Sequence, residues 1–76
     1  MNEDIITAIR DRIPDAEVDV LLDGNRALIT VVSTAFEDLS RVRKQQLVYG
    51  CIEDYIRDGR LHAVTIRAQT PAEAGG

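Results

Sequence analysis

The fold of this chain is decided by residues 17–33, which read Glu17-Val-Asp-Val-Leu-Leu-Asp-Gly-Asn-Arg-Ala-Leu-Ile-Thr-Val-Val-Ser33. Charged and apolar residues alternate from Glu17 to Leu22, a pattern typical of a half-buried strand. Asp23-Gly24 is a strong signal for a hairpin turn. The returning segment 27–33 is more uniformly apolar, which favours a more central position in the sheet. The sequence therefore predicts an antiparallel hairpin with its second strand towards the middle.

Two amphipathic helices flank this hairpin. The first is predicted over Glu3–Arg12, where isoleucines recur on one stripe, and Pro14 ends it. The second is predicted over Arg41–Arg57, with Ser40 as its N-cap and Gly59 as its C-terminal cap. Its apolar face is formed by Val48, Cys51, Ile52, Tyr55 and Ile56.

The rest of the chain completes one small sheet. Thr34–Leu39 is predicted to be a turn or short helix with Phe36 as an anchor into the core, and His62–Gln69 is the last strand. Because a long helix separates the second strand from the third, we expect these two strands to be parallel. We predict an α+β fold, a three-stranded mixed sheet with its helices on one face, as a single domain over residues 1–70 and a flexible tail over 71–76.

Composition favours a binding module over an enzyme. The chain has 76 residues, which leaves little room for both a scaffold and a deep substrate pocket. Its formal net charge of −4 disfavours non-specific binding to nucleic acid. A single cysteine suits a reducing compartment, and no apolar run approaches the roughly 20 residues of a membrane span. With no secretory signal pattern at the N-terminus, we expect a cytoplasmic protein.

Two residues could take part in metal chemistry. His62 is the only histidine, and its imidazole is either a structural group satisfied by its neighbours or a metal ligand near the surface. Cys51 lies on the predicted apolar face of the long helix, where a free cysteine behaves as a small hydrophobe. No second cysteine exists to form a zinc or dithiol site with it.

The start of the long helix is basic. Arg41, Arg43 and Lys44 oppose the positive end of the helix dipole. Such a charge arrangement indicates a partner that is a phosphate, an acidic protein surface or a carboxylate-bearing ligand. The alternative is a solvated face offset by Glu37 and Asp38, and the sequence leaves the two readings open.

Two further stretches carry a family resemblance: Ser40-Arg-Val-Arg-Lys-Gln-Gln-Leu-Val-Tyr-Gly50 and Arg60-Leu-His-Ala-Val-Thr-Ile-Arg-Ala-Gln-Thr-Pro-Ala-Glu73. Together with Ser33 and Phe36, they resemble the BolA family, and most closely its IbaG-like branch. The resemblance covers most of the chain from Glu17 onward. It implies an α-β-β-α-α-β fold similar to class II KH domains, which agrees with the predicted order of elements.

The resemblance implies a first function in iron–sulfur cluster handling. BolA-like proteins pair with monothiol glutaredoxins and share a [2Fe–2S] cluster, to which the partner contributes cysteine and glutathione sulfur. The histidine at the position of His62 is the ligand from the BolA-like chain. Replacement of thiolate by imidazole on one iron is known cluster chemistry. The chain is then a non-enzymatic partner that binds no cluster alone and is able to form a weak homodimer.

The resemblance implies DNA binding and transcriptional control as an alternative. The turn and long helix of the family resemble a helix-turn-helix surface. Arg41, Arg43 and Lys44 would hold phosphates, while Gln45 or Gln46 would read a base edge.

The chain departs from the family in the hairpin loop. Many members carry a second histidine or cysteine there, whereas this chain has Asn25 and Arg26. Neither side chain is a good cluster ligand. Arg26 is instead a candidate to pair with a glutathione carboxylate.

Overall fold

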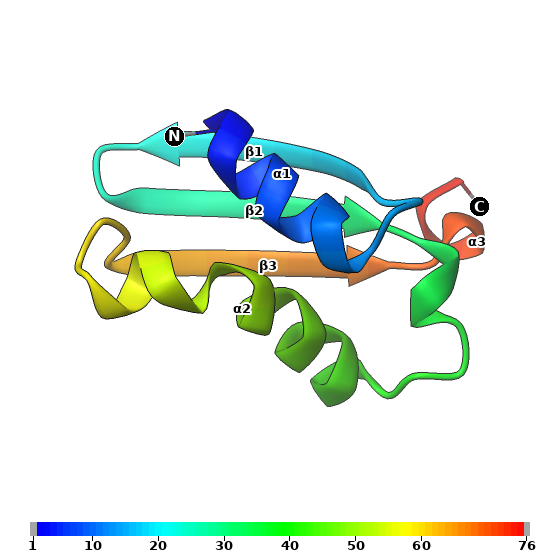
Figure 1. Ribbon diagram of the computed structural model, residues 1–76. Helices are drawn as coiled ribbons and strands as arrows, with labels where there is room; N and C mark the ends of the chain where they lie inside the picture. The colour runs from blue at the N-terminus through cyan, green and yellow to red at the C-terminus, as the bar shows by residue number, and fades with distance from the viewer. Residues whose placement is uncertain (1, 76) are drawn as a thin grey trace.

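The computed structural model describes residues 2–75, and Figure 1 shows two long helices beside a small sheet. In chain order the elements are α1 (Asn2–Arg12), β1 (Glu17–Asp23), β2 (Arg26–Val32), the 3-10 helix η1 (Thr34–Phe36), α2 (Arg41–Arg57), β3 (Ala63–Gln69) and α3 (Pro71–Gly75). The predicted α+β class is confirmed, and the bounds of α2 agree with the sequence pattern.

The sheet has the order β1-β2-β3, which makes β2 the central strand. β1 pairs with β2 antiparallel, and β2 pairs with β3 parallel. Both expectations drawn from the hairpin and the long crossover are therefore confirmed. One row of the register runs across all three strands through Val20, Ile29 and Ile66.

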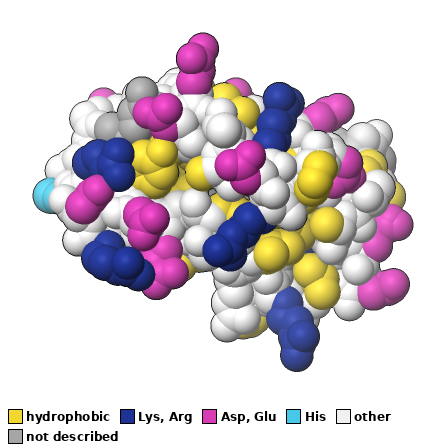
Figure 2. Space-filling model, viewed as in Figure 1, with side chains coloured by type: hydrophobic (Ala, Val, Ile, Leu, Met, Phe, Trp, Pro, Cys, Tyr) yellow, Lys and Arg dark blue, Asp and Glu magenta, His cyan; other side chains and the backbone are white. Residues whose placement is uncertain are grey.

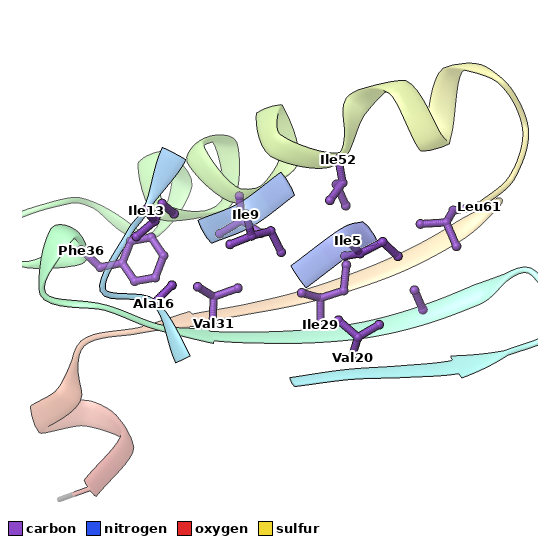
Figure 3. Close-up of a cluster of buried hydrophobic side chains, with 12 residues drawn as sticks. Ile5, Ile9, Ile13, Ala16, Val20, Ile29, Val31, Phe36, Ile52 and Leu61 are labelled. Carbon is purple, nitrogen blue, oxygen red and sulfur yellow. The ribbon is translucent and has the colours of Figure 1, made fainter. Parts of the chain in front are cut away.

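The hydrophobic core lies between the sheet and the helices α1 and α2 (Figure 3). α1 contributes Ile5 and Ile9, and both are fully buried in the core cluster between the sheet and α2. Full burial of one such side chain stabilises the fold by about 1.5–3 kcal/mol. The other fully buried apolar side chains are Ile13, Ile29, Val31, Phe36, Val48, Ile52 and Leu61.

Side chains alternate between the two faces of the sheet. Val64, Ile66 and Ala68 of β3 pack against the core, whereas Thr65 and Arg67 are exposed on the other face. Both helices cover the same face in Figure 1, so the second face of the sheet stays open, as the sequence predicted.

The last strand begins one residue later than expected, at Ala63. His62 therefore precedes β3 and is exposed in the loop after α2, instead of sharing a strand face with Val64. The loop ends at this point because the backbone N–H groups of His62 and Ala63 both donate to the carbonyl of Asn25, at 2.8 and 3.4 Å.

Residues 71–75 form the short helix α3, where the sequence analysis expected a flexible tail. The physical reason is a capping box at Thr70 and Glu73. The Glu73 carboxylate accepts from the Thr70 N–H at 2.9 Å, and the Thr70 hydroxyl accepts from the Glu73 N–H at 3.2 Å. Gly76, the last residue of the predicted tail, lies outside the described residues.

Candidate ligand site at His62

The loop that carries His62 is fixed at both ends. Gly59 ends α2 with φ +83°, a left-handed conformation that glycine adopts without a steric penalty. Leu61 is 1% exposed and its N–H donates to the carbonyl of Tyr55 at 3.1 Å. Because Leu61 is anchored in the core, the next residue, His62, is held at the surface. Figure 2 shows the one histidine at the rim of the molecule.

The imidazole of His62 lies against Asn25, from the β1–β2 turn. The side-chain amide nitrogen of Asn25 is 2.9 Å from Nδ1 of His62. If the amide donates, Nδ1 is the accepting nitrogen and the ring proton resides on Nε2; rotation of the amide by 180° would reverse these roles. The backbone and side chain of Asn25 thus orient His62 together.

This contact leaves the second ring nitrogen of His62 for an external group. Nε2 makes no hydrogen bond to any residue in the range 2–75, and a Cβ placed on Gly59 would lie 3.8 Å from it. A histidine that binds a metal through Nε2 carries no proton there and donates its Nδ1–H to a neighbouring acceptor, so metal binding requires the rotated Asn25 amide with its oxygen facing Nδ1. The geometry at His62 therefore fits one bond to a metal.

Charged groups near His62 are largely paired with one another. Arg60 lies over the ring of Tyr55, with 4.1 Å from its guanidinium carbon to the ring centroid. The same guanidinium pairs with Asp58 at 2.7 Å, and its hydrogen bond is the main cause of the lowered pKa of the Asp58 carboxyl. Arg60 is thus occupied within its own loop.

Arg26 reaches the same corner of the molecule. It is the first residue of β2, exposed, and its Cα is in register with Ala63 of β3, next to His62. The structure therefore brings Asn25, Arg26 and His62 together, although 37 residues separate Asn25 from His62. Sequence reasoning considered Asn25 only as a missing ligand and missed its contact with the histidine. No local pattern indicates this contact, because it follows from the parallel register of β2 and β3, in which Arg26 is opposite Ala63.

The basic residues predicted at the start of α2 do not form one free surface. Lys44 pairs with Glu73 of α3 at 2.8 Å. The amide of Gln45 donates to the carbonyl of Ile66 at 2.7 Å and so covers part of the outer edge of β3. Arg41 and Arg43 are exposed. The α2 N-terminus also lies at the opposite end of β3 from His62 (Figure 1).

Other potential metal ligands are scattered. Among residues 2–75 no three side chains of the His, Cys, Asp and Glu types are grouped so that they could hold a metal ion. Cys51 is half-buried and its thiol donates to the carbonyl of Leu47 at 3.3 Å. Burial raises the pKa of the Cys51 thiol, which disfavours the thiolate that a metal would need.

The matched family model identifies the class of protein. The model described as "BolA-like protein" matches residues 25–73, so the chain belongs to the BolA family. The chain is 43% identical over 72 residues to the acid stress protein IbaG of Escherichia coli K12, an alignment that covers 95% of this chain and 86% of the relative. The predicted resemblance to the IbaG-like branch is confirmed.

Solved structures agree with this assignment. BolA1 from Arabidopsis thaliana superposes with a TM-score of 0.84 at 23% identity, which covers 95% of this chain and 93% of the other. The BolA domain of SufE1 from the same plant also gives 0.84, at 28% identity and with the same two coverages. As for the membrane, none of the helices within residues 2–75 has the length and apolar character needed to cross one.

Proposed function

We propose that this protein is the partner of a monothiol glutaredoxin and shares a [2Fe–2S] cluster with it, for cluster assembly, trafficking or iron sensing. His62 supplies the one ligand from this chain, through Nε2. The protein acts by binding, without an enzymatic activity of its own, in the cytoplasm. The similarity to a protein named for acid stress supports a role in a stress response.

The observation that carries the proposal is the geometry of His62. Its ring is exposed, held at Nδ1 by Asn25 and open at Nε2. Within residues 2–75 His62 belongs to no group of three or more His, Cys, Asp and Glu side chains that could hold a metal ion. A site with a single protein ligand needs a partner that brings the remaining ligands, and thiolates from cysteine and glutathione supply them in a mixed Cys and His cluster.

Arg26 extends the site in a second way. The Cα of Arg26 is in register with Ala63, the residue after His62, and Arg26 has no acidic partner among the ion pairs of residues 2–75. A planar guanidinium binds carboxylates in a bidentate fashion. We therefore assign Arg26 to a carboxylate of glutathione and not to iron.

The test is anaerobic cluster reconstitution with a monothiol glutaredoxin and glutathione, followed by visible circular dichroism. The wild-type mixture is expected to give a spectrum distinct from that of the glutaredoxin alone, and His62→Ala is expected to abolish the difference. Arg57→Ala, which removes an exposed cation from the last residue of α2, is the matched control and should retain the wild-type spectrum. A His62→Ala protein with the wild-type spectrum would refute the ligand assignment.

DNA binding is the second candidate, favoured by the exposure of Arg41 and Arg43 at the start of α2. Because Lys44 and Gln45 are already engaged, we expect about two phosphate contacts and a slope of log K against log salt of about −1.8. The measurement is fluorescence anisotropy of a labelled duplex between about 50 and 200 mM salt. Affinity that does not change with salt would exclude this candidate.

A further inference from the structure

A cleft lies between the start of α2 and the second half of β3. Its volume is about 370 Å³, and the charged residues in its lining are Arg41, Lys44, Arg67 and Glu73. Three of these residues are cations and one is an acid, in a chain whose net charge is −4. The cleft is therefore a positive site on an acidic protein.

One carboxylate already occupies this cleft. Glu73 Oε1 is 2.8 Å from Lys44 Nζ, and that hydrogen bond is the first cause of a Glu73 pKa lowered to about 2. The Lys44 side chain is only 13% exposed, whereas the Glu73 side chain is 50% exposed. The cation is thus built into the wall of the cleft, while the acid reaches it from the short helix α3.

The two remaining cations of the cleft have no acidic partner in the described chain. Arg41 lines the cleft from α2, and Arg67 lines it from the outward face of the edge strand β3. Both are exposed, and neither forms an ion pair with another side chain in residues 2–75. The first turn of α2 contains no acidic residue, so the positive end of its dipole adds to the same field. Carboxylates placed beside Arg41 and Arg67 would neutralise this unpaired positive charge.

We propose that the cleft binds a short acidic segment of a partner protein, whose carboxylates pair with Arg41 and Arg67 and displace Glu73 from Lys44. Glu73 acts in this scheme as an internal competitor that fills the site when the partner is absent. The small volume favours a few residues of peptide over a long polyanion.

The site is separate from the one at His62. Arg67 follows His62 by five residues along β3, which corresponds to roughly 16 Å of extended strand. Occupation of the cleft therefore does not require a cluster or a glutaredoxin, and the proposal can succeed or fail independently of the function proposed above.

The experiment is a titration of the 76-residue protein followed by ¹H–¹⁵N NMR at about 50 mM salt, a low ionic strength that preserves exposed ion pairs. The probe is a blocked hexapeptide that alternates glutamate and serine. Parallel titrations use the glutamine version of the peptide, inorganic phosphate, and a single-stranded DNA oligonucleotide of equal charge. Shifts confined to amides around Arg41, Lys44 and Arg67, given only by the glutamate peptide, are the expected result.

Variants separate this site from a general charge effect. The double variant Arg41→Gln, Arg67→Gln should weaken peptide binding about fivefold or more, because two exposed ion pairs are lost. Glu73→Gln should strengthen it by about two- to fivefold, since glutamine can keep the capping box but no longer neutralises Lys44. Arg57→Gln, at the far end of α2, is the control and should leave the affinity unchanged.

Three results would overturn the proposal. The first is an unchanged affinity in the double variant, and the second is weaker binding by Glu73→Gln although its helical NMR signature is intact. The third is binding of phosphate or DNA at least as tight as that of the peptide, which would make the cleft a simple anion or nucleic acid site.

Discussion

Substitution of Ser33 by alanine tests how the end of β2 is attached to the rest of the fold. Ser33 is 1% exposed, and its hydroxyl donates to Asp15 Oδ1 at 2.6 Å. The hydroxyl oxygen of Ser33 also accepts a hydrogen bond from the N–H of Ala35 at 3.0 Å, and so it caps η1. The variant removes both hydrogen bonds at once and leaves the Ala35 N–H without its acceptor.

The expected loss can be estimated from these two contacts. A hydrogen bond to a charged group contributes about 1.5–3 kcal/mol, and an N-cap contributes about 1 kcal/mol. Asp15 keeps its bonds from the N–H and hydroxyl of Thr34, at 3.0 and 2.7 Å, which reduces the total. We expect Ser33→Ala to lower the free energy of unfolding by about 2–3 kcal/mol, or about 10–20 °C in Tm for a chain of this size.

The loss should depend on pH because Asp15 takes part. Its pKa is lowered from 3.8 to about 2, and the hydrogen bond from Ser33 is the largest cause. A depressed carboxyl pKa stabilises the fold above 3.8, and that stabilisation disappears as the pH falls through about 2. The difference between wild type and Ser33→Ala should therefore be full at neutral pH and shrink on acidification through this window.

Urea unfolding of both proteins between neutral pH and pH 2 measures this difference. Ser40→Ala is the matched control, since the Ser40 hydroxyl caps α2 by accepting from the Arg43 N–H at 3.2 Å and contacts no carboxylate. Ser40→Ala should lower the free energy of unfolding by about 1 kcal/mol, and this loss should not depend on pH. A cost for Ser33→Ala below about 0.5 kcal/mol, the size of an ordinary surface substitution, would refute the reasoning, and so would a cost that does not change with pH.

Three further substitutions probe α2 and its cap, all by thermal unfolding. Gly50→Ala should stabilise the protein by about 0.5–1 kcal/mol, because a Cβ there meets only the Arg12 side chain at 3.5 Å; a loss of stability would contradict this. Gly59→Ala should destabilise by about 1–2 kcal/mol through its φ of +83°, and an unchanged Tm would argue against strain at this cap. Gln45→Glu should cost about 1–3 kcal/mol, since the carbonyl of Ile66 loses its donor, whereas a neutral result would mean that water replaces the amide there.

The parts of the fold that follow from local patterns could be predicted from the sequence. Alternation in β1, the turn at Asp23-Gly24 and the apolar stripe of α2 each specify one element. Their order then determines the sheet, because a strand that returns after a long helix runs parallel to its neighbour. No tertiary information was needed for these steps.

The short helix α3 was missed although its signal is local. Thr70 and Glu73 stand at capping-box spacing, but the segment is rich in small residues and has no apolar stripe. Helices this short are unstable alone, so the capping box predicts a helix only when a tertiary contact supports it. Here the contact is the ion pair of Glu73 with Lys44, across 29 residues, which no local pattern indicates.

The candidate sites illustrate the same limit. His62 was found because it is a unique residue type, yet its orientation depends on Asn25, which only the strand register brings within 2.9 Å. Likewise, the sequence pattern placed Arg67 on the outward face of the last strand. Arg67 lines a cleft with Arg41 and Lys44 only because α2 packs against β3. For both sites, the residue types that could bind a ligand are visible in the sequence. The residues that contact them in the folded chain could not be predicted from it.

The arrangement of the two sites has a mechanical consequence. β3 pairs with β2 along all seven of its residues, from Ala63 to Gln69, so its ends are held by one continuous ladder. A cluster bound at His62 and a peptide bound in the cleft at Arg67 therefore contact opposite ends of one rigid strand. Without a hinge between them, binding at one site should leave affinity at the other unchanged. Hence a His62 variant should retain the peptide affinity, and a variant at Arg67 should retain the cluster spectrum; coupling between them would mean that β3 moves as the sites fill.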